Sequence, residues 1–348
     1  MYSTLYPRSR YVRELRPELP PEAFEPARSR IAFLPVHLAV ITVATLAIAA
    51  GWVPWPIVPP LSLVIGISFG CLSFIAHEAL HGGIVRGKRL RHAIGWIGFM
   101  PFVLSPRLWN AWHDRIHHAT ANLPEDPDGY PTLAQYESNP RARFFINWFS
   151  LGGRRWRGML SLVLGFTVQI GLQMIATMSG KFLSPRDRRL AFAETAVGIG
   201  VWTAVAALVG FVPFLFVFVL PLLVGNAIVM SFILTNHSLS PLLEVNDPLA
   251  GGLSVTAWRW VEWITLGFGF HVEHHLFPSM STRHAPKVRA LVRARWPERY
   301  QSMPLVAAVA RLHRTARVYK DAITLIDPRT GHEFPTLGAS SVAAPRAA

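Results

Sequence analysis

Long apolar blocks arranged as two hairpins dominate the hydrophobic pattern of the chain. The first hairpin covers residues 31–76 and turns at 53–56, and the second covers 191–234 and turns at 212–213. Each arm has about 20 residues, which is enough for a helix to cross the roughly 30 Å of hydrocarbon in a bilayer. The pattern therefore predicts an all-α membrane protein with four transmembrane helices in two hairpins.

Two further apolar stretches, residues 93–104 and 158–178, need a different interpretation. The first is too short to cross a bilayer. The second is long enough, but a single crossing would move the basic segment 181–189 to the other side. It would also separate the histidine clusters described below. We therefore predict that both stretches lie in the interface or re-enter the membrane.

Charge placement gives the orientation. The chain has 34 basic and 20 acidic residues, a net charge of +14, yet no Lys or Arg falls within 31–76 or 191–234. Basic residues flank the hairpins instead, which by the positive-inside rule places both turns outside and all four other ends in the cytoplasm. A nucleic-acid partner is not expected, because such a partner needs one solvated basic patch.

The remaining composition defines the expected organisation. We predict a cytoplasmic N-terminal segment over 1–30, a membrane domain with a cytoplasmic helical cap over 31–300, and a cytoplasmic extension over 301–348. The first 30 residues and the end after Thr336 are expected to be poorly ordered. Residues 1–30 lack the apolar core of a signal peptide. The single cysteine, Cys71, excludes an internal disulfide. Because Arg strongly outnumbers Lys, we expect a bacterial inner membrane protein.

Nine of the 14 histidines fall into four places, each at or beyond a predicted cytoplasmic helix end. Residues three and four apart share a helix face, so three sets of side chains should each converge: His77 with His81, His113 with His117, and His271 with His274 and His275. Adjacent residues point about 100° apart, so His117 and His118 could serve two different metals. The predicted ligands are His77 and His81; His113, His117 and His118; His237; and His271, His274 and His275.

Nine imidazoles exceed the three or four that one zinc ion takes and suit two metal ions. Imidazole binds iron, zinc, copper and nickel, and iron can also change oxidation state and leave positions open for O₂. We therefore predict a di-iron centre. The outward ring nitrogens need acceptors that fix each ring. The candidates for this supporting role are Glu78, Asp114, Asn236, Glu273, Asp126 and Asp128.

These clusters resemble the membrane fatty-acid desaturase and hydroxylase superfamily. Its three motifs, HxxxH, HxxxHH and H/QxxHH, match residues 77–81, 113–118 and 271–275, and the resemblance covers roughly residues 30–300. His237 is similar to the additional histidine after the last span. The resemblance implies two iron ions as cofactor, O₂ as co-substrate, and an acyl chain linked to a lipid, CoA or acyl-carrier protein. A double bond is the expected product. A hydroxylase or carotenoid oxygenase of the same superfamily is the alternative.

The chain carries no cytochrome-b5-like, ferredoxin or flavin motif. Electrons are therefore expected from a separate protein of the ferredoxin, rubredoxin or cytochrome b5 type. Trp109, Trp112 and Trp148 could lie at the membrane interface or pack beside the metals, and we expect the interface, the usual place for Trp in membrane proteins.

One rival interpretation rests on the first cluster alone. His77-Glu78-Ala-Leu-His81 matches HExxH, in which Glu is the general base of a zinc protease. Together with Asp128-Gly129 it resembles an intramembrane metalloprotease. That hypothesis leaves seven clustered histidines unexplained. A ferritin-like protein needs more Glu-x-x-His pairs, and a transporter needs its polar residues near the midplane.

Overall fold

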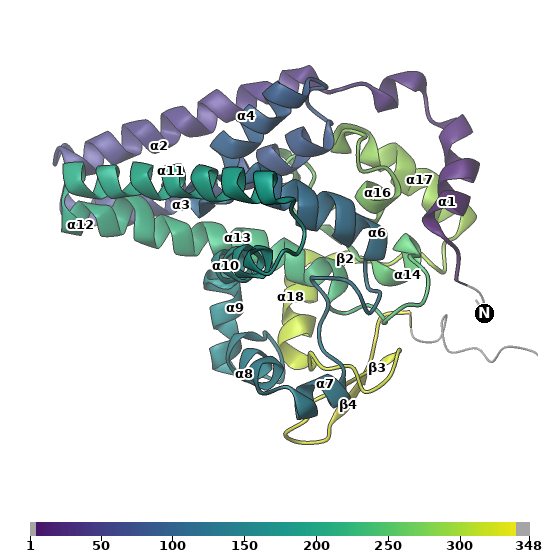
Figure 1. Cartoon of the computed structure of the whole chain (residues 1–348). Helices are drawn as coiled ribbons and strands as arrows, with labels where there is room; N and C mark the ends of the chain where they lie inside the picture. Colours follow the sequence, from purple (N-terminus) through teal and green to yellow (C-terminus); the bar gives the residue numbers. More distant parts are fainter. Residues whose placement is uncertain (1–4, 339–348) are drawn as a thin grey trace, which may run out of the picture.

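The computed structural model describes residues 5–338, and it is mostly helical. The disorder expected at the extreme C-terminus falls on 339–348, outside the described residues. Four helical segments are long and apolar enough to cross a membrane, covering Pro21–Ala49, Trp55–His81, Pro185–Val209 and Phe211–His237. The predicted all-α architecture with four spans is therefore confirmed. In Figure 1 the spans extend to the left, and the cap lies to the right of them and below.

The spans form a bundle centred on α3 (Val58–His81) and α13 (Leu220–His237). These two helices approach closely at Gly66, where a Cβ atom would lie 2.5 Å from the Val224 side chain. The first hairpin partner is α2 (Phe33–Ala49), and α11 (Pro185–Val209) precedes α13. Both outer helices expose apolar side chains such as Val43 (64%) and Leu208 (84%). Exposed apolar helix faces of this kind suit contact with lipid.

The turn of the second hairpin differs slightly from the prediction. It lies at Gly210, whose φ of 83° is in the left-handed region that favours glycine. Residues 212–213, the predicted turn, belong to the short helix α12 (Phe211–Phe214). Proline is tolerated in the first turn of a helix because its missing N–H has no intrahelical partner there. A π-helical turn η8 (Leu215–Val219) then joins α12 to α13.

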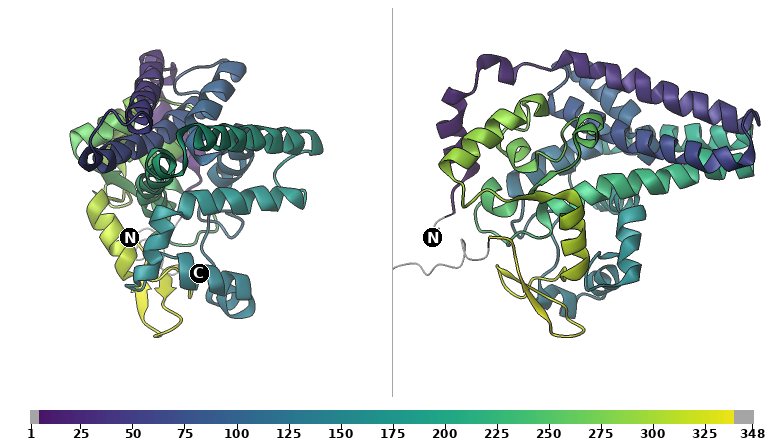
Figure 2. Two further views of the ribbon diagram at one scale, coloured as in Figure 1. Left: turned by 90° about the vertical axis from the view of Figure 1, so that its left-hand side faces the viewer. Right: turned by 180° about the vertical axis from the view of Figure 1, so that it is seen from behind.

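The two further apolar stretches form helices that are not among the four long candidate spans. Residues 93–104 fall on α4 (Lys88–Phe99) and the 3-10 turn η5 (Met100–Phe102). Residues 158–178 form α9 (Leu160–Val163) and α10 (Gly165–Met178), which together with the 3-10 turn η7 (Trp156–Met159) are bent by 68° at Leu164. In Figure 1 α10 is seen nearly end-on while the spans run across the picture, and in the left view of Figure 2 it lies across the view. This geometry agrees with the re-entrant or interfacial prediction.

The cap is built from short helices and two small sheets. Its helices are α1 (Arg8–Leu15), α5 (Pro106–Trp109), η6 (Asn110–His117), α6 (His118–Thr120), α7 (Leu133–Ser138), α8 (Pro140–Phe149), α14 (Pro248–Gly251), α15 (Arg259–Ile264), α16 (His271–Leu276), α17 (Ala285–Arg295) and α18 (Leu305–Arg314). Strand β1 (Ser254–Thr256) pairs in parallel with β2 (Ser302–Pro304), and β3 (Thr324–Ile326) pairs antiparallel with β4 (Glu333–Pro335).

The described part of the N-terminal segment, residues 5–30, is packed, contrary to the expectation of poor order. Tyr11 and Leu15 of α1 are fully buried in a cluster with residues of α16 and α17. The Tyr11 hydroxyl also donates to the buried carboxylate of Asp247 at 3.0 Å. The basic helix α1 therefore packs through a short apolar face. The segment's composition is strongly polar overall, so the sequence did not reveal this face. The C-terminal extension likewise packs back on the cap through β2 and α18.

Candidate metal centre

The nine predicted histidines come together at the end of the bundle. His77 and His81 lie in the last turns of α3, and His237 is the last residue of α13. The second cluster lies on η6 and α6, and the third on α16. Seven of the nine side chains are buried, while His113 and His237 are half-buried. Four segments far apart in the sequence therefore converge on one polar centre.

The imidazoles divide into two groups. In the first, one nitrogen from each of five histidines lies within 4.8 Å of all the others: His77, His81, His113, His118 and His274. The second contains His117, His237 and His275 on the same criterion. His271 joins the second group, because its Nε2 lies 2.6 Å from Nε2 of His237.

Adjacent histidines are thus split between the two groups in both double-histidine motifs. His117 and His118 belong to different groups, as predicted, and so do His274 and His275. The expected convergence within each cluster is only partly correct. His274 faces the first group while its neighbours His271 and His275 face the second. The segment carrying His113 is also a π-helix rather than an α-helix, a rare geometry that sequence periodicity does not reveal.

The nitrogen spacing suits metal ions. Nε2 of His77 lies 3.2 Å from Nε2 of His113, and the same atoms of His118 and His274 are 3.2 Å apart. Nε2 of His237 is 3.3 Å from Nε2 of His275. Two ligands about 2.1 Å from one metal ion, at tetrahedral or octahedral angles, lie roughly 3.0–3.4 Å from each other. The clusters are therefore able to bind metal.

A buried nitrogen without a partner supports this. Nε2 of His81 is buried and has no hydrogen-bond partner among the described residues, although its Nδ1 lies 3.0 Å from Asp114. Such groups are rarely left unsatisfied in a folded protein. A cation at the centre of the first group would take up this lone pair and those of the facing imidazoles.

Three of the outward ring nitrogens have acceptors that fix their orientation. Asp114 accepts from His81, and Asp126 accepts from Nδ1 of His117 at 2.9 Å. The Gly251 carbonyl accepts from Nδ1 of His237 at 2.9 Å. Each of these bonds points the opposite nitrogen, Nε2, toward the centre, as a ligating histidine requires. The Gly251 carbonyl was not predicted, because no side-chain pattern marks it.

Glu78, Glu273 and Asn236 do not take the predicted supporting role. Glu78 accepts from Arg30, Ser281 and the Thr282 backbone, so it ties α3 to two other parts of the chain. Glu273, fully buried, accepts from three side chains: Ser254, Arg289 and Tyr300. The Asn236 Oδ1 atom has no partner among the described residues. The helix turns the side chains of Glu78 and Glu273 away from the face that carries the histidines.

Burial and the carboxylates of Asp126 and Asp128 determine the pKa values of the ionisable groups at the centre. Burial, followed by repulsion from neighbouring imidazoles, holds the pKa values of His113, His118 and His275 well below the usual value, which keeps these rings neutral. Burial also lowers the pKa of His117, but the Asp126 carboxylate outweighs it and raises that pKa to about 9. Burial raises the pKa of the neighbouring Asp128 to about 6.

Two tryptophans lie beside the histidines rather than at the interface, which corrects the prediction. Trp109 and Trp112 are 3% and 2% exposed, and the Trp109 ring centroid lies 4.8 Å from that of His113. Trp112 donates to Asp128 at 2.8 Å. Trp148, in contrast, is 40% exposed. The first two precede His113 by four residues and by one, a spacing that could have indicated their position.

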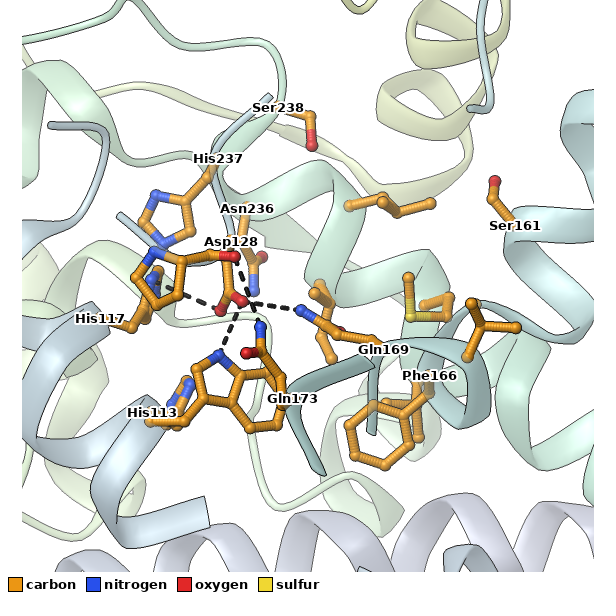
Figure 3. A pocket seen from close by; sticks show the side chains of 18 of the residues that line it. His113, His117, Asp128, Ser161, Phe166, Gln169, Gln173, Asn236, His237 and Ser238 are labelled. Carbon is orange, nitrogen blue, oxygen red and sulfur yellow. Dashed lines mark hydrogen bonds and ion pairs between the residues drawn. The ribbon is translucent and has the colours of Figure 1, made fainter. Parts of the chain in front are cut away.

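A cavity of about 300 Å³ opens onto the centre. Five of the nine histidines line one end: His77, His113, His117, His237 and His271. The rest of the wall is largely apolar and aromatic, contributed by α3, α8, α10 and α13, with residues such as Phe74, Phe149, Phe166, Leu172 and Met230. Figure 3 shows the histidines at one side of this cavity and Phe166 and Ser161 at the other. A long apolar molecule could lie here with part of its length beside the histidines.

Histidine clusters able to bind metal, placed at one end of an apolar cavity in a chain with four candidate spans, fit a membrane metalloenzyme that acts on an apolar chain. The profile of the family described as "Fatty acid desaturase" matches residues 50–306. The chain belongs to the fatty acid desaturase family.

Its curated relatives are distant. It is 22% identical to an "sn-1 oleoyl-lipid 12-desaturase" of Arthrospira platensis, over 68% of this chain and 70% of that protein. Identity to the protein of the same name from a Picosynechococcus strain is also 22%, over 82% and 83%. The "Omega-6 fatty acid desaturase, chloroplastic" of Spinacia oleracea is 21% identical, over 82% and 64%.

Proposed function

We propose that this protein uses a di-iron centre to insert a double bond into the acyl chain of a membrane lipid. One iron would be held by the five-histidine group, and the other by His117, His237, His271 and His275. The observation that carries the proposal is the convergence of all nine imidazoles at one end of the apolar cavity. Two bound irons would supply the O₂-dependent oxidation of an unactivated methylene.

The chain's own residues would then position and protect the reaction. The apolar wall binds the acyl chain and excludes water, which favours oxidation of a chosen methylene over side reactions. Asp114, Asp126 and the Gly251 carbonyl hold three ligand rings in place. The names of the relatives favour an acyl-lipid substrate over a CoA or carrier-protein thioester. We place the centre on the cytoplasmic side, following the positive-inside pattern, where a separate electron-transfer protein could reach it.

Two observations weigh against the zinc-protease alternative. Both carboxylate oxygens of Glu78 lie within 2.8 Å of Arg30 Nη1, so this side chain is committed to an ion pair rather than to a water on a metal ion. The first group also contains five imidazoles, more than a catalytic zinc ion takes.

Lipid profiling tests the proposal. The protein is expressed in a host whose phospholipids lack polyunsaturated chains, and its lipids are analysed by mass spectrometry. A new double bond should appear with the wild type and with His332→Ala, whose histidine is exposed and outside the centre. It should disappear with His117→Ala. A new hydroxyl group at equal iron content would favour the hydroxylase alternative, and unchanged lipids would contradict both.

A further inference from the structure

The wall of the cavity contains a polar contact that the metal site does not require. Gln169 lies on α10, and its Nε2 donates to Oδ1 of Asp128 at 2.8 Å. Both residues line the cavity, whose other lining residues are mostly apolar. Figure 3 shows the Gln169 amide reaching Asp128 between the histidines and the end of the cavity marked by Phe166.

Asp128 links this helix to the metal centre. The same Oδ1 atom accepts from Trp112 Nε1 at 2.8 Å, and Oδ2 lies 3.6 Å from Nδ1 of His117. Trp112 immediately precedes the ligand candidate His113 on η6. One carboxylate therefore joins the cavity wall to the helix that carries the second histidine cluster.

The rest of α10 has few polar attachments. Near its start, the Thr167 backbone donates to the buried Asn226 of α13 at 2.9 Å, and near its end the Thr177 carbonyl accepts from Arg188 at 3.2 Å. Its outer face is exposed, with Ile175 at 64% and Met178 at 68%. In the middle of the helix, on the cavity side, the short polar contact is that of Gln169.

We propose that Gln169 is a positioning residue, which fixes α10 relative to the histidine centre and thereby determines which carbon–carbon bond of the bound chain is oxidised. The inference rests on the proposed function for its substrate. An acyl chain carries no polar group along its length that could fix how far it enters the cavity. The position of the cavity wall must therefore decide which carbon atoms lie beside the histidines. A hydrogen bond to a carboxylate that is only 15% exposed is strong enough to hold that position.

The test uses three variants of the full-length, iron-loaded protein in lipid nanodiscs. Gln169→Leu removes the donor with little change in volume. Trp112→Phe removes the other donor to the same oxygen. Gln173→Leu is the matched control, because it makes the same polar-to-apolar change one turn along the same face. The Gln173 side chain makes a longer contact, 3.5 Å from its Nε2 to the Pro127 carbonyl oxygen.

Two readouts are taken. The first is the position of the new double bond, located by mass spectrometry of the lipids. The second is amide hydrogen exchange over residues 166–178, which depends neither on iron nor on turnover. Iron content is measured for every variant, so that loss of metal is recognised.

We expect Gln169→Leu to give a mixture of neighbouring double-bond positions. Amide exchange in α10 should be at least about tenfold faster than in the wild type, the scale of one lost hydrogen bond to a charged group. Trp112→Phe should change both readouts in the same direction. Gln173→Leu should keep the wild-type position and exchange, whatever its turnover.

Wild-type product and exchange in Gln169→Leu would overturn the inference, as would equal changes in Gln173→Leu. If the wild type makes no double bond, the proposed function fails. The exchange comparison then still decides whether Gln169 holds α10, because faster exchange confined to Gln169→Leu and Trp112→Phe supports that contact and unchanged exchange contradicts it.

Discussion

The ion pair between Arg30 and Glu78 separates a structural from a catalytic role for the glutamate of the first cluster. The two side chains are 16% and 5% exposed, and the Arg30 guanidinium lies 2.6 Å from the Glu78 carboxylate. Glu78 also accepts from Ser281 and from the Thr282 backbone. It thus connects the residues before α2, the metal-bearing end of α3 and the segment after α16.

The perturbation is Glu78→Gln, which keeps the shape of the side chain and removes its charge. Arg30, whose side chain is 16% exposed, is then left without its counterion, which costs about 3–5 kcal/mol in comparable buried pairs. For 348 residues the unfolding entropy is about 0.7 kcal/mol/K, so the melting temperature should fall by about 4–7 °C.

The assay is thermal unfolding of the purified protein in detergent, followed by intrinsic fluorescence. A double variant, Arg30→Met with Glu78→Met, should lose much less than the sum of the single variants, because no charge is left unpaired. The exposed pair Arg10–Glu14 provides the control, and Glu14→Gln should leave the melting temperature unchanged.

A general base would behave differently. If Glu78 activates a water on a metal ion, Glu78→Gln should abolish the reaction and leave the melting temperature at the wild-type value. That result would refute the structural role of Glu78 and revive the protease alternative.

Three further outcomes follow from the site and the cap. Asp126 accepts a hydrogen bond from the backbone N–H of Asn122, and Asp126→Asn places an amide near that N–H. The variant should weaken iron binding in the His117 group about 10- to 100-fold in a competitive chelator titration. Asp114→Asn should weaken iron binding less, because its carboxylate is 41% exposed and screened by solvent; an equal loss would contradict this ranking. Arg317→Met should destabilise the protein by about 3 kcal/mol, because Arg317 is buried and donates to several backbone carbonyls, and each acceptor left unpaired is costly. Arg314→Met, at an exposed position three residues earlier, is its control, and equal melting temperatures would refute the role of Arg317.

The sequence was most informative where a repeating physical constraint acts. A membrane span needs a long apolar run, so the four spans could be located, and the position of the basic residues led to the re-entrant interpretation of 158–178. The histidines were found for a similar reason, since their chemical type and spacing are both unusual. Two metals could be expected from the number of imidazoles alone.

The details that failed depend on long-range packing. A periodicity argument assumes a regular α-helix, and the π-helix around His113 breaks that assumption. The acceptors for the rings were only partly predictable. Asp114 accepts from the first cluster and Asp126 from the second, whereas the Gly251 carbonyl becomes an acceptor only when a distant loop folds against His237. Glu78 looked like a ring acceptor because Arg30, its true partner, lies 48 residues away.

The same limit applies to Gln169. Nothing local in the sequence pointed to its partner Asp128, 41 residues earlier in the chain. Buried polar pairs between distant segments carry little signal in a single sequence, although they fix how the elements sit around the site.

Metal analysis combined with Mössbauer spectroscopy tests the central claim most directly. The protein is produced in ⁵⁷Fe-enriched medium, purified, and measured for iron and zinc per chain, with His117→Ala and His332→Ala in parallel. The account predicts two irons per chain in the wild type and in His332→Ala, with the spectrum of a nitrogen-ligated pair, and loss of iron from the second group in His117→Ala. One zinc ion per chain, or a single iron unaffected by His117→Ala, would contradict it.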